Sequence, residues 1–357
     1  MTGLIERIGI RLPFIQAPMA GTSTPALAAA VSNAGALGSI GVGAVDAAGA
    51  RAMIADLRQR TEAPFNVNVF VHQPATENAA RERDWLFALA PLFRTFDSEP
   101  PASLKEIYKS FRVDAAMVDL LVETRPAVIS FHFGLPTAEV IARLKQRGVV
   151  LLSTATNLQE AEAAERAGID AVVAQGYEAG GHRGVFDPKI PDSQLGVTAL
   201  TRILVRRLSI PVIAAGGIMD GAGIAAMLEL GAEAAQLGTA FIGCPESAAD
   251  AYYRAALFGP GANATEMTPF ISGRPARSLP NRFTALKADV LKDLTPPDYP
   301  IAYDAGKALA TAARSKGEGG FGAQWAGQGA PLARALPAAD LVRILSEELA
   351  LARAQKA

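Results

Sequence analysis

Short apolar runs alternate with segments of helical periodicity along most of the chain. Eight runs are predicted as strands, at residues 14–19, 36–43, 65–72, 127–133, 149–155, 170–176, 211–217 and 232–241. Helical segments are predicted between them at 24–35, 47–61, 136–145, 157–168, 197–208 and 220–230. Strands that alternate with helices indicate a parallel sheet. Eight such units favour an α/β fold closed into a (β/α)8 TIM barrel over an open doubly wound sheet.

Some intervals are too long for simple connections between barrel units. Residues 73–126 form an insertion in which RERDWLFALAPLF and LKEIYKSF are both predicted as short amphipathic helices. Residues 177–196 are a polar, glycine-rich loop. The tail is predicted to contain helical pieces near 282–293, 303–315 and 338–355 and a glycine-rich surface loop, ordered or mobile, at 318–329.

The length of the chain supports the same division. A TIM barrel takes about 250 residues, so a chain of 357 residues leaves a surplus of roughly a hundred. We expect residues 1–258 to form the barrel with its insertion, and residues 259–357 to form an extension that packs on the barrel mouth. Neither the insertion nor the extension shows the pattern of an independent core.

Charge and composition exclude several classes of protein. The 34 Lys and Arg against 35 Asp and Glu leave a net charge of −1 and no basic patch for nucleic acid. The single cysteine, Cys244, rules out an internal disulfide, a thiolate zinc cage and an all-cysteine iron–sulfur site. We interpret it as a small buried apolar residue.

One long uncharged stretch raises the question of a membrane segment. Residues 12–45 contain no charged side chain, but prolines and glycines interrupt them as in a strand, loop and helix. Glu6 and Arg11 interrupt any apolar core of a signal peptide. We therefore expect a cytoplasmic protein that does not enter a membrane.

Candidate chemistry lies where the predicted strands end, because barrel enzymes carry their functional groups there. His132 ends the fourth strand, and Gln175 and His182 follow the sixth. Asn68 and Gln175 would either hydrogen-bond inside the barrel or bind the polar edge of a flat heterocycle. His182 lies among glycines in a loop that cannot form a core, so we favour a functional role. The histidines lack metal-ligand spacing, and His72 is assigned no catalytic role.

Glycines mark three of these strand ends. Gly216 and Gly217 follow the seventh strand, Gly238 and Thr239 follow the eighth, and 180–181 follow the sixth. These glycines could simply turn the chain. Their recurrence on consecutive strand ends favours a site where backbone N–H groups bind a phosphate-bearing cofactor or substrate.

Five segments, which follow one another along the chain, also carry a family resemblance: QAPMAGTSTPALAAAVSNAGALGSIGVG, FNVNVFVH, SFHFGLP, AQGYEAGGHRG and PVIAAGGIMDGAGIAAMLELGAEAAQLGTAFI. Together they resemble nitronate monooxygenases of the bacterial class I, formerly grouped under 2-nitropropane dioxygenase. The tail, with Tyr299, Tyr303 and Lys307, is similar as well, so the resemblance covers nearly the whole chain.

The resemblance implies FMN at the barrel mouth. Residues beside the flavin ring would be Ala17, Pro18, Met19, Asn68, Gln175, Gly180 and Gly181, and residues around the ribityl phosphate would be Gly216, Gly217, Gln236, Leu237, Gly238 and Thr239. The phosphate site expected from the glycines alone coincides with the second group.

The implied reaction is oxidation of an alkyl nitronate, with propionate 3-nitronate favoured, by O2 through a flavin semiquinone and without NAD(P)H. His182 would be the catalytic residue, either as a donor to the nitronate or as a neutral base toward a nitroalkane. Substrate contacts would come from His132, Tyr108, Tyr299, Tyr303 and Lys307, the last four supplied by the insertion and the tail as a cover.

Two other functions remain open at this point. The first is an NADH-dependent FMN quinone or enoyl-thioester reductase, and the second is a flavin-binding protein without catalysis. The expected partners are a small nitronate and O2, with no nucleic acid or membrane, and a homodimer is left open.

Overall fold

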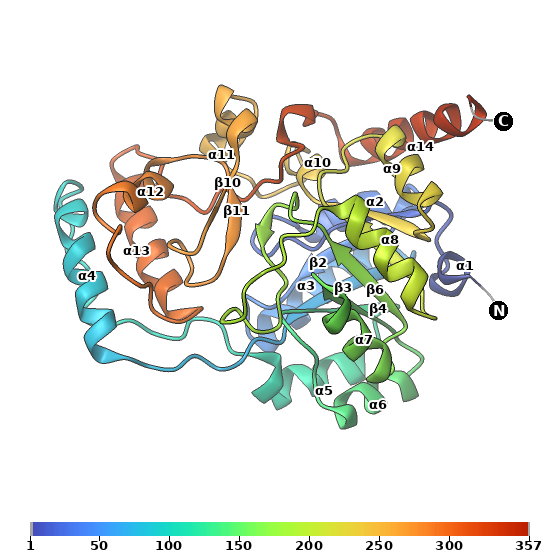
Figure 1. Ribbon diagram of the computed structural model, residues 1–357, viewed down its shortest axis with the longest axis horizontal. Coiled ribbons are helices and arrows are strands. Elements are labelled where there is room, and N and C mark those ends of the chain that lie inside the picture. Colours follow the sequence, from blue (N-terminus) through green and yellow to red (C-terminus); the bar gives the residue numbers. More distant parts are fainter. Residues whose placement is uncertain (1–2, 356–357) are drawn as a thin grey trace.

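The computed structural model describes residues 3–355 and confirms the TIM barrel (Figure 1). Its eight parallel strands are β1 (Phe14–Gln16), β2 (Gly38–Gly41), β3 (Phe65–Phe70), β4 (Val128–His132), β5 (Val150–Ala155), β6 (Ala171–Gln175), β8 (Val212–Ala215) and β9 (Ala234–Leu237). They pair in the order β1-β9-β8-β6-β5-β4-β3-β2. A bridge between Ile15 and Leu37 joins the two ends of the sheet. Each of the eight predicted strands is present.

Helices surround the barrel because their apolar faces pack on the outer side chains of the strands. These helices are α2 (Pro25–Asn33), α3 (Ala47–Arg60), α5 (Ala115–Thr124), α6 (Ala138–Gln146), α7 (Leu158–Arg166), α8 (Val197–Arg207) and α9 (Gly221–Glu229). Side-chain caps fix where they begin: Thr24 accepts from the Leu27 N–H, and Asn157 accepts from the Glu160 N–H. A short helix, α1 (Leu4–Ile8), packs with the apolar cluster at the opposite end of the barrel from the strand C-termini.

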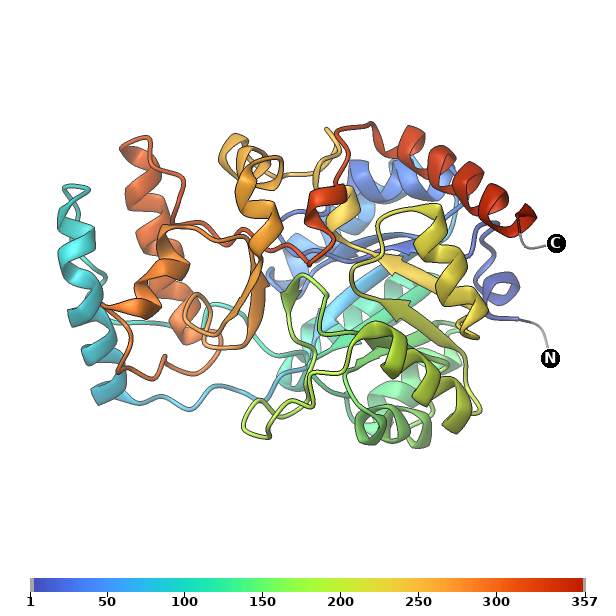
Figure 2. The same cartoon turned by 45° about the horizontal axis from the view of Figure 1, so that its top comes forward.

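The insertion forms an arm that extends away from the barrel. Helix α4 (Ala79–Arg94) packs against α13 (Ile301–Ser315) of the tail, and both lie at the left end in Figures 1 and 2. The fully buried Trp85 stacks on Phe270, with ring centroids 6.2 Å apart. This contact joins the arm to the tail.

The prediction of a helix over LKEIYKSF was wrong. Residues 104–110 have no regular helical structure, and only η1 (Phe111–Val113), a single 3₁₀ turn, follows. The Lys105 N–H donates to Asp304 of the tail, and the Ser110 hydroxyl donates to the His72 carbonyl. Because these long-range contacts hold the segment, they outweigh its local helical pattern. The barrel helix α5 lies further along, at residues that were not predicted as a helix.

The tail contains more strand than was predicted. After β9 come α10 (Thr239–Ile242) and α11 (Ala251–Leu257). The tail then comprises η2 (Pro260–Ala264), β10 (Glu266–Thr268), β11 (Ala276–Ser278), α12 (Arg282–Ala285), η3 (Leu286–Ala288), α13, η4 (Ala330–Leu332) and α14 (Ala338–Ala354). Strand β11 pairs antiparallel with β7 (Gly181–His182) from the loop after β6. The tail is therefore hydrogen-bonded to the barrel mouth, while α14 returns to pack on α2 and α9.

Two further expectations about the tail need correction. The helix predicted at 282–293 is reduced to α12 and the turn η3. The loop 318–329 does not lie on the surface, since Phe321 and Ala326 are buried. The Gly327 N–H donates to the Thr239 hydroxyl at 2.9 Å, so this loop packs directly on the end of β9. Its glycines allow close backbone approach here.

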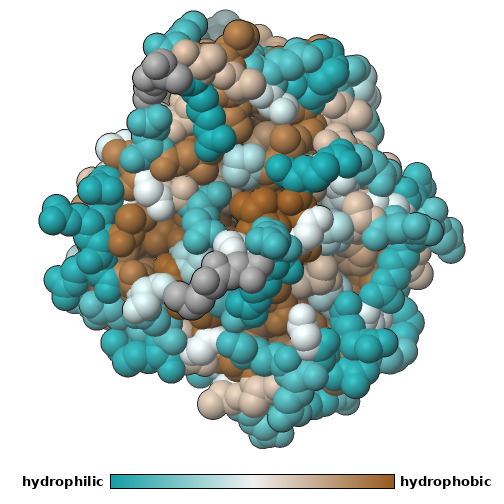
Figure 3. Space-filling model, turned by 90° about the vertical axis from the view of Figure 1, so that its right-hand side faces the viewer, coloured by the Kyte–Doolittle hydropathy of each residue, from teal (hydrophilic) through white to brown (hydrophobic). Residues whose placement is uncertain are grey.

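Figure 3 shows the end of the molecule that carries both termini. Hydrophilic side chains surround separate apolar patches on this face. Across residues 3–355, no helix is both long enough and apolar enough to cross a bilayer.

The packing of the arm predicts a measurable difference between two aromatic residues of α4. Trp85→Ala should lower the free energy of unfolding by about 3–5 kcal/mol, because it leaves a cavity between arm and tail. Phe87→Ala is the matched control, since Phe87 is 84% exposed and its loss should change stability by about 0.5 kcal/mol or less. Urea unfolding of both variants measures this. Equal effects would contradict the packing described.

Candidate active site

A cavity of about 170 Å³, open at its mouth, lies at the C-terminal ends of the barrel strands. All but one of the residues predicted to bind the cofactor line it: Ala17, Pro18, Met19, Asn68, Gln175, Gly180, Gly181, Gly216, Gly217, Gln236, Gly238 and Thr239. The exception is Leu237, whose side chain is buried in the apolar cluster between barrel and helices. Its carbonyl accepts from the Ala17 N–H at 2.8 Å and so supports the segment after β1.

The predicted substrate residues come from three separate parts of the chain. His132, Tyr108, Tyr299 and Tyr303 line the cavity. Lys307 is exposed beside it, with its ammonium 5.0 Å from the Tyr108 ring centre and 5.5 Å from that of Tyr303. The arm, the tail and the barrel therefore meet around one space.

Glycines line one side of the cavity, and three of them cannot be replaced without strain or collision. Gly216 and Gly217 have φ of +130° and +68°, in the region that L side chains rarely adopt. A Cβ on Gly180 would lie 2.5 Å from the Gly327 nitrogen. Within residues 3–355, no hydrogen-bond acceptor is found for the N–H of Gly180 or Gly217. Unpartnered backbone donors of this kind suit an anion such as a phosphate.

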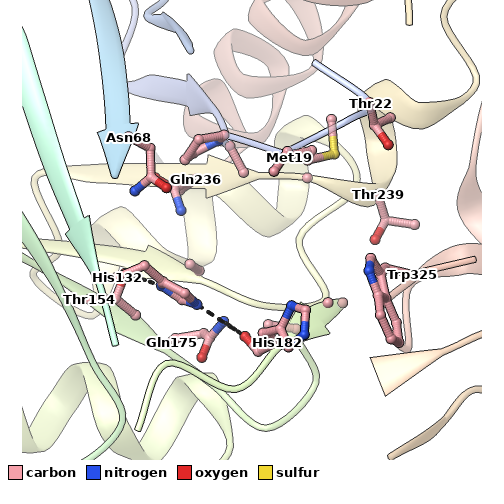
Figure 4. Close-up of a pocket in the computed structure, with 18 of the residues that line it drawn as sticks. Met19, Thr22, Asn68, His132, Thr154, Gln175, His182, Gln236, Thr239 and Trp325 are labelled. Carbon is pink, nitrogen blue, oxygen red and sulfur yellow. Dashed lines mark hydrogen bonds between the residues drawn. The ribbon is translucent and has the colours of Figure 1, made fainter. Parts of the chain in front are cut away.

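Two side-chain amides, those of Asn68 and Gln236, lie elsewhere on the wall. Figure 4 shows Asn68 and Gln236 close together beside the segment that carries Met19. The Asn68 amide nitrogen donates to the Ser130 carbonyl at 3.1 Å and to the Ser130 hydroxyl at 2.9 Å, which leaves its oxygen for a ligand. Such an arrangement fits the polar edge of a flat heterocycle.

Two side chains hold the backbone carbonyl of His182. Its carbonyl accepts from the Gln175 amide at 3.0 Å and from the His132 Nε2–H at 3.2 Å, the contacts seen in Figure 4. Its ring lies 5.1 Å from that of Trp325 and 5.3 Å from that of Tyr299. The ring nitrogen Nε2 is 2.8 Å from the Ser272 hydroxyl oxygen. In the described part of the chain, Nδ1 has no partner and is the nitrogen available to a ligand.

His132 has a different geometry. Because a carbonyl only accepts, its Nε2 must carry the proton. Its Nδ1 is 3.0 Å from the Thr154 hydroxyl oxygen and accepts from it. Both ring nitrogens are thus occupied by the protein, and His132 supports the loop that presents His182.

The electrostatics of the site keep these histidines neutral. Burial lowers the pKa of His132 to about 4, and burial also lowers the pKa of His182 well below its usual value. The positive charge of Arg274 reinforces both effects. Arg274 is itself buried, and no acidic side chain pairs with it among residues 3–355. Its guanidinium lies 4.3 Å above the Phe133 ring and donates to the Val185 carbonyl.

The phenols around the cavity are neutral donors. Burial raises the pKa of Tyr299 well above its ordinary value and that of Tyr303 to about 12. Burial also raises the pKa of Tyr108. At neutral pH these hydroxyls can donate hydrogen bonds to an anionic group.

Sequence reasoning missed three residues of the tail: Trp325, which lines the cavity, Ser272, which contacts the His182 ring, and Arg274, whose charge reinforces burial in lowering the pKa of His132 and His182. No motif marked them, because the β7–β11 pairing that places them joins residues about ninety positions apart. Their only signal in the sequence was the surplus length of the tail.

Comparisons with known proteins agree with this geometry. A family model described as nitronate monooxygenase matches residues 2–348. A nitronate monooxygenase of Paraburkholderia phytofirmans is 61% identical over 97% of this chain and 94% of its own, and one of Pseudomonas aeruginosa is 57% identical over 98% and 99%. The crystal structure of a nitroalkane oxidase from Streptomyces ansochromogenes is 42% identical, with a TM-score of 0.90 over 99% of this chain and 100% of that one.

The buried histidines predict loss of stability in acid. Burial and Arg274 lower the pKa of His72 from 6.5 to about 4. Between these values the unfolded chain binds more protons than the folded chain, so the unfolding free energy falls as the pH falls. At pH 5 His72 should account for about 2 kcal/mol of that fall.

His72→Phe should remove this contribution. We expect the loss of unfolding free energy between pH 7.5 and pH 5 to be smaller in the variant by about 2 kcal/mol. Urea unfolding at the two pH values measures the difference. The same loss in both proteins would show that His72 is not held neutral by burial.

Proposed function

The chain belongs to the nitronate monooxygenase family of oxidoreductases, and from this premise we propose that it oxidises an alkyl nitronate with O2 by means of bound FMN and without NAD(P)H. The observation that carries the proposal is one cavity that joins a glycine-lined anion site to the free nitrogen of His182. We further propose that the insertion 73–126 and the extension 259–357 act as a cover that shapes the substrate end of this cavity.

The wall residues fit FMN. The free N–H groups of Gly180 and Gly217 would hold the phosphate, together with Gly216, Gly238 and the Thr239 hydroxyl. The Asn68 oxygen and the Gln236 amide would bind the polar edge of the ring system. Bound FMN would take electrons from the nitronate and pass them to O2.

The remaining groups suit an anionic substrate with a second negative group, such as propionate 3-nitronate. The hydroxyls of Tyr108, Tyr299 and Tyr303 can donate to its oxygens, and the Lys307 ammonium lies beside two of these phenols. The buried positive charge of Arg274 raises the potential of the whole region. His182 is neutral, so we assign it the role of holding or accepting a proton at Nδ1 next to the substrate.

Steady-state measurements separate this function from a reductase. With propionate 3-nitronate, we expect O2 consumption and nitrite release without any nicotinamide. His182→Ala should keep the flavin and lose about 10²–10⁴ of the turnover, the usual contribution of a proton-transfer group. Rapid NADH oxidation with a quinone, together with no response to the nitronate, would contradict the proposal.

The phosphate site predicts a loss of cofactor in a glycine variant. Gly217→Ala places a side chain on a residue with φ of +68° in the glycine-lined wall, so FMN content after purification should fall severalfold. Gly148→Ala is the matched control, because Gly148 has φ of +78° and open space around it away from the cavity. Both variants carry similar backbone strain of about 1–2 kcal/mol. Equal flavin content, read from the visible spectrum, would contradict the assignment of Gly217.

A further inference from the structure

Ser272 contacts the Nε2 nitrogen of the His182 ring, whereas Nδ1 is the ring nitrogen available to a ligand. Its hydroxyl oxygen is fully buried and lies 2.8 Å from His182 Nε2. The same oxygen lies 3.1 Å from the Arg274 carbonyl oxygen and 3.4 Å from the Arg274 backbone nitrogen. The turn that holds Ser272 requires glycine at position 273, since Gly273 has φ of +89° and a Cβ there would lie 2.4 Å from the Pro297 carbonyl oxygen.

The protons of this network can be assigned by counting donors. The Arg274 carbonyl only accepts, and the Arg274 N–H only donates. The single hydroxyl proton of Ser272 can satisfy the carbonyl, and its oxygen accepts from the Arg274 N–H. The contact with His182 is then favourable only if Nε2 carries the proton and donates to Ser272. If the Ser272 hydroxyl donated to His182 Nε2 instead, no proton would lie between the Ser272 hydroxyl oxygen and the Arg274 carbonyl oxygen, which are 3.1 Å apart.

We propose that Ser272 is a positioning residue that holds His182 as the Nε2–H tautomer, so that the nitrogen facing the cavity, Nδ1, is a hydrogen-bond acceptor. His132 and Gln175 fix the backbone of His182, and Ser272 fixes the orientation and protonation of its ring.

This tautomer gives the groups around the cavity different hydrogen-bonding roles. An acceptor nitrogen cannot donate to the anionic oxygens of a substrate, so those donors must be the tyrosine hydroxyls and Lys307. His182 instead meets a substrate group that carries a proton: the hydroxyl of the nitronic acid, which is the protonated form of the nitronate, or the α carbon of the parent nitro compound. This catalytic consequence rests on the proposed function, whereas the tautomer itself does not.

The tautomer can be read without any substrate. The chain contains only three histidines, so long-range proton–nitrogen spectra of ¹⁵N-histidine-labelled flavin-bound protein resolve each ring. A His182→Asn variant assigns the His182 signals. We expect a pyrrole-type Nε2 and a pyridine-type Nδ1 in His182. His132 is an internal control, because the His182 carbonyl fixes it as the Nε2–H tautomer independently of Ser272. A pyridine-type Nε2 in wild-type His182 would overturn the proposal whatever the variants show.

The role of Ser272 is tested by a pair of variants. Ser272→Ala should give a mixture of His182 tautomers, leave His132 unchanged and lower kcat about tenfold or more, with little change in KM or flavin content. Ser272→Thr keeps the hydroxyl and should restore the single tautomer and most of kcat. If Ser272→Ala retains a pure Nε2–H tautomer and a kcat within twofold of wild type, the proposal is wrong. Absence of nitronate oxidation in the wild type would refute the proposed function and leave the spectra unaffected.

Discussion

The antiparallel pairing of β7 with β11 is the interaction on which the site depends. It is only two residues long on the β7 side, yet it joins the loop after β6 to the tail and aligns Ala276 with His182. The same pairing brings the Ser272 hydroxyl to 2.8 Å from the histidine ring, and a bridge from Ser278 of β11 to Trp325 sets the indole ring 5.1 Å from it. Within the barrel, Gln175 and His132 hold only the His182 carbonyl, so the contact to the His182 ring nitrogen Nε2 comes from the tail.

The buried positive charge of Arg274 contributes to the electrostatics around His182. Arg274 is a buried cation that forms no ion pair in the described part of the chain, although the charges of Glu160 and Asp187 act on it. The histidines and phenols of the site are neutral. Buried charges are usually paired, so an unpaired one costs stability unless a bound anion balances it. A site of this kind discriminates in favour of anions and keeps His182 neutral at the same time.

The barrel could be predicted from the sequence because its signals are local. The strands are short apolar runs, several of them followed closely by glycine or by a helix cap such as Asn157, and all eight were found. The glycine sites were predictable for the same reason, since Gly216 and Gly217 follow directly after β8.

Long-range contacts account for what the sequence did not reveal. Residues 104–110 have a helical pattern, but Asp304 and His72 hold them in a non-helical path. The loop 318–329 reads as surface from its composition, yet Gly327 binds Thr239 and Phe321 is buried. The contact of Ser272 with His182 spans 90 positions, and no local pattern encodes it.

Anaerobic mixing of the purified protein with propionate 3-nitronate tests the central claim most directly. The claim is that one cavity brings an anionic nitronate to a bound flavin that needs no nicotinamide. We predict that the nitronate alone changes the visible flavin absorption within the mixing experiment, while NADH and NADPH leave it unchanged. Rapid bleaching by either nicotinamide, with no change on adding the nitronate, would contradict the account.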